Sequence, residues 1–176
     1  MQKKGRKKTS KAGTRAPKAA AKAAARAAKD NVRTATALAG IERVLSGVEH
    51  IGIAVRDSDQ AARLMCAILG AKVIESIVSH ERGLKLTFLD LGETKVELLE
   101  PLTGEGTVAK FLETEGEGFH HIAFRVSDIK SALTFLRQAG VKLVEPAPQK
   151  GAHGNLMAFI HPSSACGILV ELCERK

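Results

Sequence analysis

Two histidines and two glutamates stand at matching places in the two halves of the chain. His50 begins the run His-Ile-Gly-Ile-Ala-Val, and His121 begins the run His-Ile-Ala-Phe-Arg-Val 71 residues later. Glu97 and Glu171 lie in near copies of one apolar segment, Val-Glu-Leu-Leu-Glu and Val-Glu-Leu-Cys-Glu. A carboxylate within an apolar strand is costly unless it is paired or bound to a cation. Imidazole nitrogens and carboxylate oxygens together suit a divalent metal, with Co, Mn, Ni, Fe and Zn all compatible. These four residues therefore predict a metal site to which each half contributes one His and one Glu.

The alternation of side chains along a strand indicates which histidines share this site. In the first strand His50 lies on the face with small residues, whereas Ile51 and Ile53 lie on the opposite face, which suits packing against a helix. In the repeated strand His121 is the partner of His50, and its neighbour His120 shares a face with apolar residues. We therefore expect His121→Ala to abolish the activity of the site and His120→Ala to leave it largely intact.

The elements that position these residues follow one order in both halves: a strand, a helix and three further strands. The helices are expected to begin at Asp57 or Ser58 and at Ser127 or Asp128, and to end at Gly70 and Gly140. The later strands are expected at Lys72–Val78, Leu84–Leu91 and Thr94–Leu99, and at Lys142–Glu145, Leu156–His161 and Gly167–Cys173. A half of about 55 residues has too small a core to be stable alone. We predict an α+β fold in which two βαβββ modules, about 47–101 and 118–176, form a curved mixed sheet around a metal-binding cleft.

The positive charge of the chain is concentrated at its N-terminus. The 176 residues carry a formal net charge of +8, and residues 1–29 contain eleven Lys and Arg without one acid. We expect residues 1–46 to be a basic, Lys/Ala-rich extension that is disordered or partly helical. A solvated extension, an organelle transit peptide and a nucleic-acid-binding arm are all compatible with it. The chain is expected to be cytoplasmic, or mitochondrial if residues 1 to about 40 are a transit peptide, and nucleic acid is a partner only through this tail.

Composition excludes several classes of protein. No apolar run reaches 18 residues, which argues against a transmembrane helix and a membrane partner. Three cysteines without Cys-x-x-Cys spacing argue against a disulfide scaffold or a thiolate zinc site. Trp and Tyr are absent and aromatic residues are only 3%, which argues against a surface that stacks nucleic-acid bases.

Several motifs make the chain similar to the vicinal-oxygen-chelate (glyoxalase) superfamily and, within it, to the methylmalonyl-CoA epimerases. The motifs are His50-Ile-Gly-Ile-Ala-Val, Lys95-Val-Glu-Leu-Leu-Glu-Pro101, Gly118-Phe-His-His-Ile-Ala-Phe, Gly151-Ala-His-Gly154, His161-Pro and Gly167-Ile-Leu-Val-Glu-Leu. The resemblance implies that His50, Glu97, His121 and Glu171 ligate a divalent metal, Co²⁺ foremost and Mn²⁺, Ni²⁺ or Zn²⁺ as alternatives. It also implies a homodimer, an acyl-CoA substrate, and interconversion of (R)- and (S)-methylmalonyl-CoA through an enediolate.

Inversion of configuration requires a proton acceptor on one face of the substrate and a donor on the other. We expect Glu171 to serve one face and Glu81 the other, because relatives place a glutamate after Gly83 where this chain has Leu86. For contacts with the substrate we expect Lys150 and Arg82 at the phosphates and His153 in the pocket.

Two other classes of function are compatible with these motifs. One alternative is another metal-dependent enzyme of the superfamily, of the glyoxalase or dioxygenase type. The other is a non-enzymatic binding protein. A fourth ligand, Glu97, argues against the dioxygenases, which use two His and one carboxylate. Deleting residues 1–40 would distinguish an enzyme, which keeps its activity, from a protein that binds through its tail.

Overall fold

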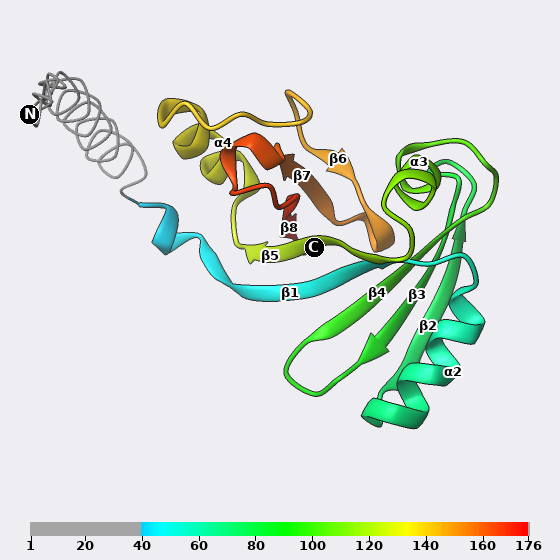
Figure 1. Ribbon diagram of the computed structural model, residues 1–176. Helices are drawn as coiled ribbons and strands as arrows, with labels where there is room; N and C mark the ends of the chain where they lie inside the picture. The colour runs from blue at the N-terminus through cyan, green and yellow to red at the C-terminus, as the bar shows by residue number, and fades with distance from the viewer. Residues whose placement is uncertain (1–39, 176) are drawn as a thin grey trace, which may run out of the picture.

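The computed structural model describes residues 40–175, so residues 1–39 of the expected basic extension lie outside the described part (Figure 1). The first module contains β1 (Leu45–Ala54), α2 (Ser58–Leu69), β2 (Lys72–Ser79), β3 (Leu84–Asp90) and β4 (Lys95–Pro101). The second module contains β5 (Gly118–Val126), α4 (Ile129–Gln138), β6 (Gln149–Lys150), β7 (Leu156–Ile160) and β8 (Val170–Glu174). Helix α3 (Thr107–Thr114) joins the modules, and three 3-10 turns, η1 (Ile41–Arg43), η2 (Ala152–Gly154) and η3 (Pro162–Ser164), complete the described chain.

The strand order of the sheet confirms the duplication. The eight strands follow the order β2-β3-β4-β1-β5-β8-β7-β6, so the second half of the sheet mirrors the first. The pairs β1–β4 and β5–β8 are parallel, and the two modules meet where β1 pairs antiparallel with β5. The sheet curves, and its helices lie at the periphery (Figure 1). The predicted α+β fold of two βαβββ modules is therefore confirmed.

Both helices begin at the predicted residues, α2 ends at Gly70 as predicted, and α4 ends at Gln138, two residues before the predicted Gly140. Asp57 precedes α2 and its carboxylate accepts a hydrogen bond from the backbone N–H of Gln60, while Asp128 does the same for Ser131 ahead of α4. Gly70 ends α2 in the left-handed region, at φ 68°. These ends depend on local chemistry, which explains why they could be predicted from the sequence.

A second carboxylate holds the start of each helix, and it comes from the last strand of the same module. Glu100 of β4 accepts hydrogen bonds from the N–H and the hydroxyl of Ser58, at 2.9 and 2.6 Å. Glu174 of β8 accepts from the N–H of Ile129 at 2.7 Å. Each of these glutamates lies three residues after Glu97 or Glu171, and an odd spacing puts the two carboxylates of a strand on opposite faces. One face of each strand therefore serves the site and the other anchors a helix.

The cores lie on both faces of the sheet. Ile53 of β1 packs with Ala61 and Met65 of α2, as the alternation along that strand predicted. On the other face α3 contributes Val108 and Leu112 to a cluster that contains buried side chains of β3 and β4. A third cluster forms between α4 and the second half of the sheet. These clusters fix the strands whose side chains build the site.

Two segments of the second module differ from the prediction. Lys142–Glu145 forms no strand and makes one isolated bridge, from Leu143 to Ile160, and β6 begins later at Gln149. Prolines follow at positions 146 and 148, and a proline donates no hydrogen bond to a sheet. The last strand begins at Val170 rather than Gly167, because Cys166 and Gly167 adopt positive φ angles, which bend the chain out of an extended conformation.

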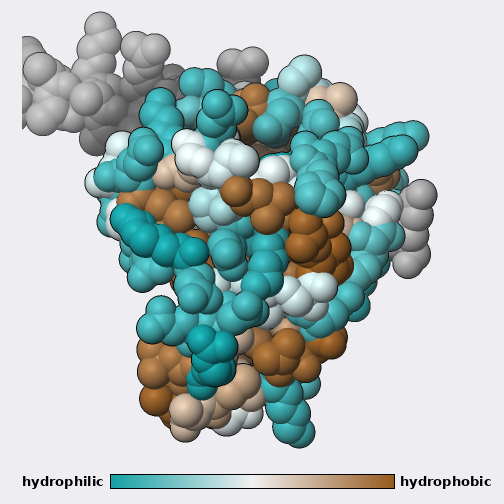
Figure 2. Space-filling model, turned by 90° about the vertical axis from the view of Figure 1, so that its right-hand side faces the viewer, coloured by the Kyte–Doolittle hydropathy of each residue, from teal (hydrophilic) through white to brown (hydrophobic). Residues whose placement is uncertain are grey.

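The surface over α2 and β2 exposes several large apolar side chains. They are Leu64, Ile68, Leu69, Val73, Ile74 and Val78. Figure 2 shows apolar side chains between hydrophilic ones on this side of the molecule. Within residues 40–175, no helix combines the length and the hydropathy needed to cross a membrane.

Candidate metal centre

The four predicted ligand residues come together at the middle of the sheet. His50, Glu97, His121 and Glu171 belong to β1, β4, β5 and β8, which are the four central strands. All four are buried, and none is more than 7% exposed. One ligand atom each from His50, His121 and Glu171 lies within 4.8 Å of the other two. The two halves of the duplicated sequence thus place equivalent side chains close together at the middle of the sheet.

The pairing of β1 with β5 explains why the two imidazoles meet. His50 pairs with Ala123 and His121 pairs with Gly52, so each histidine lies opposite the residue two positions after the other histidine. Gly52 has a specific role in this arrangement, because a Cβ atom there would lie 2.2 Å from Cε1 of His121. The ring of His121 therefore occupies the space that the missing side chain leaves. Sequence reasoning had noted only that this face carries small residues.

The spacing of the donor atoms suits a single cation. Nε2 of His50 lies 3.1 Å from Nε2 of His121, and Oε2 of Glu97 lies 3.3 and 3.6 Å from these two nitrogens. Oε2 of Glu171 lies 3.4 Å from Nε2 of His121. Two ligand atoms about 2.1 Å from one ion and at right angles about it are about 3.0 Å apart. The two nitrogens and the Glu171 carboxylate thus lie within reach of one divalent cation, Glu97 adjoins both nitrogens, and no thiolate is among these donors.

Burial and mutual charge set the protonation of these groups. Burial lowers the pKa of His121 to about 3, so this ring is neutral and its Nε2 lone pair is available to a metal. Burial would lower the pKa of His50, but the hydrogen bond and charge of Glu97 raise it above its usual value. Burial would raise the pKa of Glu97, but the hydrogen bond from His50 lowers it. Burial raises the pKa of Glu171 to about 7.

His120 supports the ring of His121 from behind. Its Nδ1 lies 2.9 Å from Nδ1 of His121, the nitrogen that does not face the carboxylates. The ring of His120 packs edge-on against Phe111 of α3, with centroids 5.0 Å apart. A ligand histidine is commonly fixed through its second ring nitrogen. The sequence left open which group would hold this nitrogen, and the structure identifies His120.

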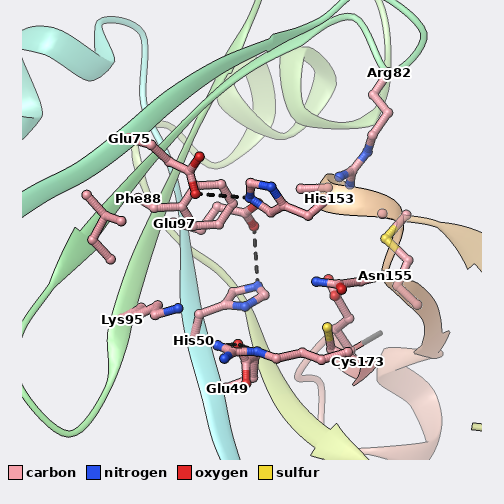
Figure 3. Close-up of a pocket in the computed structure, with 16 residues that line it drawn as sticks. Glu49, His50, Glu75, Arg82, Phe88, Lys95, Glu97, His153, Asn155 and Cys173 are labelled. Atoms are coloured by element: carbon pink, nitrogen blue, oxygen red, sulfur yellow. Dashed lines mark hydrogen bonds and ion pairs between the residues drawn. The ribbon is translucent and has the colours of Figure 1, made fainter.

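A cavity of about 330 Å³ opens over the centre. His50, Glu97 and Glu171 line it, and its rim carries the cationic residues Arg82 and Lys95. Lys95 begins β4 directly beside His50 in the sheet, and sequence reasoning missed it because surface lysines are rarely distinctive. Figure 3 shows Arg82 and Lys95 on opposite sides of the cavity, with Glu97 and His50 between them.

The other predicted site residues divide into two groups. His153 lines the cavity together with Arg82, as expected of residues that contact a substrate. Lys150 is exposed on β6 and does not line the cavity, although its neighbour Gly151 does. Glu81 is exposed in the turn between β2 and β3 and does not line the cavity either. Glu81 therefore lies outside the cavity lining, and its role as the second proton-transfer group stays a prediction.

An ion network centred on the buried Glu49 borders the cavity. Glu49, 6% exposed, precedes His50 and binds the guanidinium groups of Arg125 and Arg175. The Nε atoms of both arginines lie 2.7 Å from its carboxylate oxygens. Burial would raise the pKa of Glu49, but the two arginines lower it below its usual value. Glu49 is therefore an ionised residue that joins β1 to β5 and to the C-terminal segment.

Comparison with known proteins agrees with this architecture. Residues 49–159 match the profile of the Glyoxalase/Bleomycin resistance protein/Dioxygenase superfamily. The chain is 38% identical over 129 residues to the mitochondrial methylmalonyl-CoA epimerase of Homo sapiens, an alignment that covers 73% of each protein. It is 39% identical over 132 residues to the ethylmalonyl-CoA/methylmalonyl-CoA epimerase of Cereibacter sphaeroides, with 73% of this chain and 98% of that protein covered.

A solved structure extends the agreement to three dimensions. A variant of Streptomyces coelicolor methylmalonyl-CoA epimerase, in complex with 2-nitronate-propionyl-CoA, is similar to this chain with a TM-score of 0.69 and 34% identity. The similarity covers 74% of this chain and 97% of that one. Members of the superfamily bind divalent metals, and the group of His50, His121 and Glu171 described above could hold one. This chain therefore belongs to the glyoxalase/bleomycin resistance/dioxygenase superfamily and, within it, to the methylmalonyl-CoA epimerase family.

Proposed function

We propose that this protein interconverts (R)- and (S)-methylmalonyl-CoA by metal-assisted removal and return of the α-proton. The observation that carries the proposal is the buried group of His50, His121 and Glu171, with Glu97 beside both histidines, at a cavity of about 330 Å³. His50, Glu97 and Glu171 line this cavity. The relatives that are identical to this chain at more than a third of the aligned positions are named for this activity. The cluster supplies the chemistry that the reaction needs.

The proton in question lies between a thioester carbonyl and a carboxylate, and at neutral pH it is too weakly acidic for an unaided side chain. A divalent cation held by His50, Glu97, His121 and Glu171 would stabilise the negative charge that develops on the substrate oxygens when this proton leaves. The donor atoms are nitrogen and oxygen, which suit Co²⁺, Mn²⁺, Ni²⁺ and Zn²⁺ alike. The resemblance to the family places Co²⁺ foremost among them. Cys173 also lines the cavity, but burial raises its pKa to about 12 and keeps it a neutral thiol.

Glu171 is the proposed proton acceptor on one face of the substrate. Its carboxylate is 4% exposed and borders the cavity at the edge of the ligand cluster. An acceptor must lie within hydrogen-bonding reach of the proton that it removes. A substrate that approaches the metal centre through the cavity reaches Glu171 at the same point.

The rim of the cavity supplies charge for an anionic substrate. An acyl-CoA with a free carboxylate carries negative charge at both of its ends. Arg82 and Lys95 border the cavity from the β2–β3 turn and the start of β4. We propose that they attract the substrate carboxylate and the CoA phosphates. Lys150, although outside the lining, remains a proposed contact for the phosphates because it adjoins Gly151.

Exchange of the α-proton with deuterium tests the proposal directly. The purified protein, freed of metal with a chelator and then given Co²⁺, is expected to incorporate deuterium at the α-carbon of methylmalonyl-CoA in D₂O. The metal-free protein and the His121→Ala variant should not incorporate it. Absence of incorporation with each of Co²⁺, Mn²⁺, Ni²⁺ and Zn²⁺ would refute the proposal. The same assay with ethylmalonyl-CoA measures how far the cavity accepts a longer side chain.

Assembly and location are proposals that follow from the family. We propose a homodimer, for which light scattering of the purified protein is the measurement. A cytoplasmic location is proposed, with a mitochondrial one as the alternative if residues 1 to about 40 are a transit peptide. Residues 1–39, on which the proposed location depends, lie outside the described part of the chain.

A further inference from the structure

We propose that His153 is the second proton-transfer group, which donates to and accepts from the face of the substrate opposite Glu171. The inference rests on the proposed function, since it assigns the group that an epimerase needs in addition to Glu171. Its basis is the position of His153 across the sheet, its backbone conformation and its contact with Glu75.

His153 and Glu171 lie on opposite sides of His50, Glu97 and His121. Across the sheet the order of strands is β3, β4, β1, β5 and β8. His153 packs over Phe88 of β3, with ring centroids 6.0 Å apart, and Phe88 is paired in the sheet with Glu97. Glu171 belongs to β8, at the other end of this series. A substrate held over the central strands therefore has His153 on one side and Glu171 on the other, and both line the same cavity.

The backbone at His153 holds the ring in place at an energetic cost. His153 has a φ angle of 58°, in the left-handed region that non-glycine residues seldom adopt. It is the central residue of η2, between Gly151 and Asn155, and the N–H of Gly151 donates to the carbonyl of Asn155 at 2.8 Å. Residues kept in such conformations are concentrated at functional sites. The loop thus projects a histidine, rather than a glycine, from its tightest point.

Glu75 orients the imidazole. Its Oε1 lies 3.0 Å from Nε2 of His153, and Nδ1 of His153 has no hydrogen-bond partner among residues 40–175. Figure 3 shows His153 between Glu75 and the open part of the cavity, above Glu97 and His50. A carboxylate that holds one nitrogen of a histidine leaves the other to exchange a proton with the substrate. The pair also spans the cleft, because Glu75 comes from the first module and His153 from the second.

Other titratable groups of the cavity are less suited to this role. Glu49 is bound by two arginines. Arg82 and Lys95 are already proposed to attract the anionic groups of the substrate. A reversible epimerisation requires one group to act as an acid in one direction and as a base in the other, which an imidazole does near neutral pH.

The proton balance is simple. In one direction the Cα–H bond of the substrate breaks, its proton passes to the Glu171 carboxylate, and the electron pair enters the thioester as an enolate. The protonated His153 then gives its proton to Cα from the opposite face, which forms the new C–H bond and leaves a neutral imidazole. In the other direction His153 accepts the proton and Glu171 donates it. Exchange with solvent resets both groups.

The variant His153→Asn separates the two faces of the reaction. Asparagine tolerates positive φ, so the loop can keep its conformation, but it transfers no proton. With Co²⁺ in D₂O, each epimer is incubated separately. Net epimerisation is expected to fall about 100-fold or more. One epimer, whose α-proton faces Glu171, should still take up deuterium with retention of configuration, whereas the other epimer should not.

A histidine outside the cavity provides the matched control for His153→Asn. His80→Asn, at an exposed residue of the β2–β3 turn outside the cavity lining, should behave as wild type. Bound Co²⁺ per chain, measured by elemental analysis, should be the same in the wild type and in both variants. The inference is wrong if His153→Asn epimerises at the wild-type rate, or if it loses deuterium uptake equally from both epimers. If the wild-type protein exchanges neither epimer, the proposed function fails rather than the role of His153.

Discussion

Gly52 is the residue whose missing side chain makes room for the metal centre. Its position opposite His121 in the sheet leaves no space for a Cβ atom, which would lie 2.2 to 2.7 Å from three atoms of the imidazole ring. Here the glycine is required by close approach to a ring and not by an unusual backbone angle, since its φ is not among the positive ones. The same contact explains how two histidines 71 residues apart can place their Nε2 atoms 3.1 Å apart.

Replacing Gly52 with alanine should therefore displace the ring of His121. We expect Gly52→Ala to weaken Co²⁺ binding by about 10-fold or more. Gly104→Ala is the matched control, because a Cβ atom there meets nothing within 4 Å and its φ is not positive. Isothermal titration of the metal-free proteins with Co²⁺ measures both variants. Equal affinities in the two variants would contradict this account of Gly52.

His120 acts on the centre through His121. The alternation of side chains predicted that His120 lies on the other face of its strand and that His120→Ala has little effect. In the structure, however, Nδ1 of His120 lies 2.9 Å from Nδ1 of the ligand residue His121. We expect His120→Ala to weaken Co²⁺ affinity by about 10- to 100-fold. Activity should return at saturating metal, unlike that of His121→Ala. Titration of activity against Co²⁺ distinguishes the two, and an unchanged midpoint for His120→Ala would show that the contact does not position His121.

At the scale of elements, the last strand of each module performs two tasks at once. Its first glutamate, Glu97 or Glu171, faces the cavity, and its second, Glu100 or Glu174, holds the first turn of the helix of the same module. The alternation of side chains along a strand makes this division possible over only four residues. Helix, strand and site are thereby held in one fixed relation in both modules.

Removal of these helix anchors should destabilise the fold without changing the ligands. We expect Glu174→Ala to lower the free energy of unfolding by about 1 to 3 kcal/mol. Glu100→Ala should lower it more, because Glu100 accepts two hydrogen bonds from Ser58, which is fully buried. Glu113→Ala, at an exposed position of α3, is the control. Unfolding in urea gives all three values, and wild-type stability in both anchor variants would exclude this role.

At the scale of the whole molecule, Glu49 ties the two modules and the C-terminal segment together. It lies on β1, Arg125 lies on β5, and Arg175 follows β8. The two arginines lower the pKa of Glu49 from a reference value of 4.5, which means that the folded state favours its ionised form. Its contribution to stability is then present above the unfolded-state pKa and is lost as the pH falls through the folded-state pKa.

Glu49→Gln should show this dependence on pH. At about pH 7 the variant is expected to unfold at a lower urea concentration than the wild type, because both arginines lose their charged partner. The difference should shrink as the pH is lowered below about 4.5, because the unfolded chain then takes up a proton on Glu49, and it should vanish once the folded carboxylate is protonated at a lower pH. A difference that is constant from about pH 7 to pH 3 would show that ionisation of Glu49 does not contribute.

Much of this protein could be predicted from local patterns. The duplication, the fold class and the helix ends follow from repeated motifs, side-chain alternation and capping residues, which act over a few neighbouring positions. The same patterns singled out His50, Glu97, His121 and Glu171, the side chains that the structure brings together. The strand expected at Lys142–Glu145 was wrong because two following prolines weaken pairing there, and the alternation of apolar residues did not reveal this.

Contacts across the cleft could not be read in the same way. Whether Glu81 or His153 borders the cavity depends on how a turn and a loop from different modules fold over the sheet. The fit of Gly52 against His121, and of His120 behind it, depends on the register between β1 and β5. Repeats and periodicity indicate which residues share a face of a strand, because side chains alternate along the local backbone. Contacts between side chains across the cleft form only when segments far apart in the sequence pack together. They depend jointly on the loop conformations and the strand register of both modules.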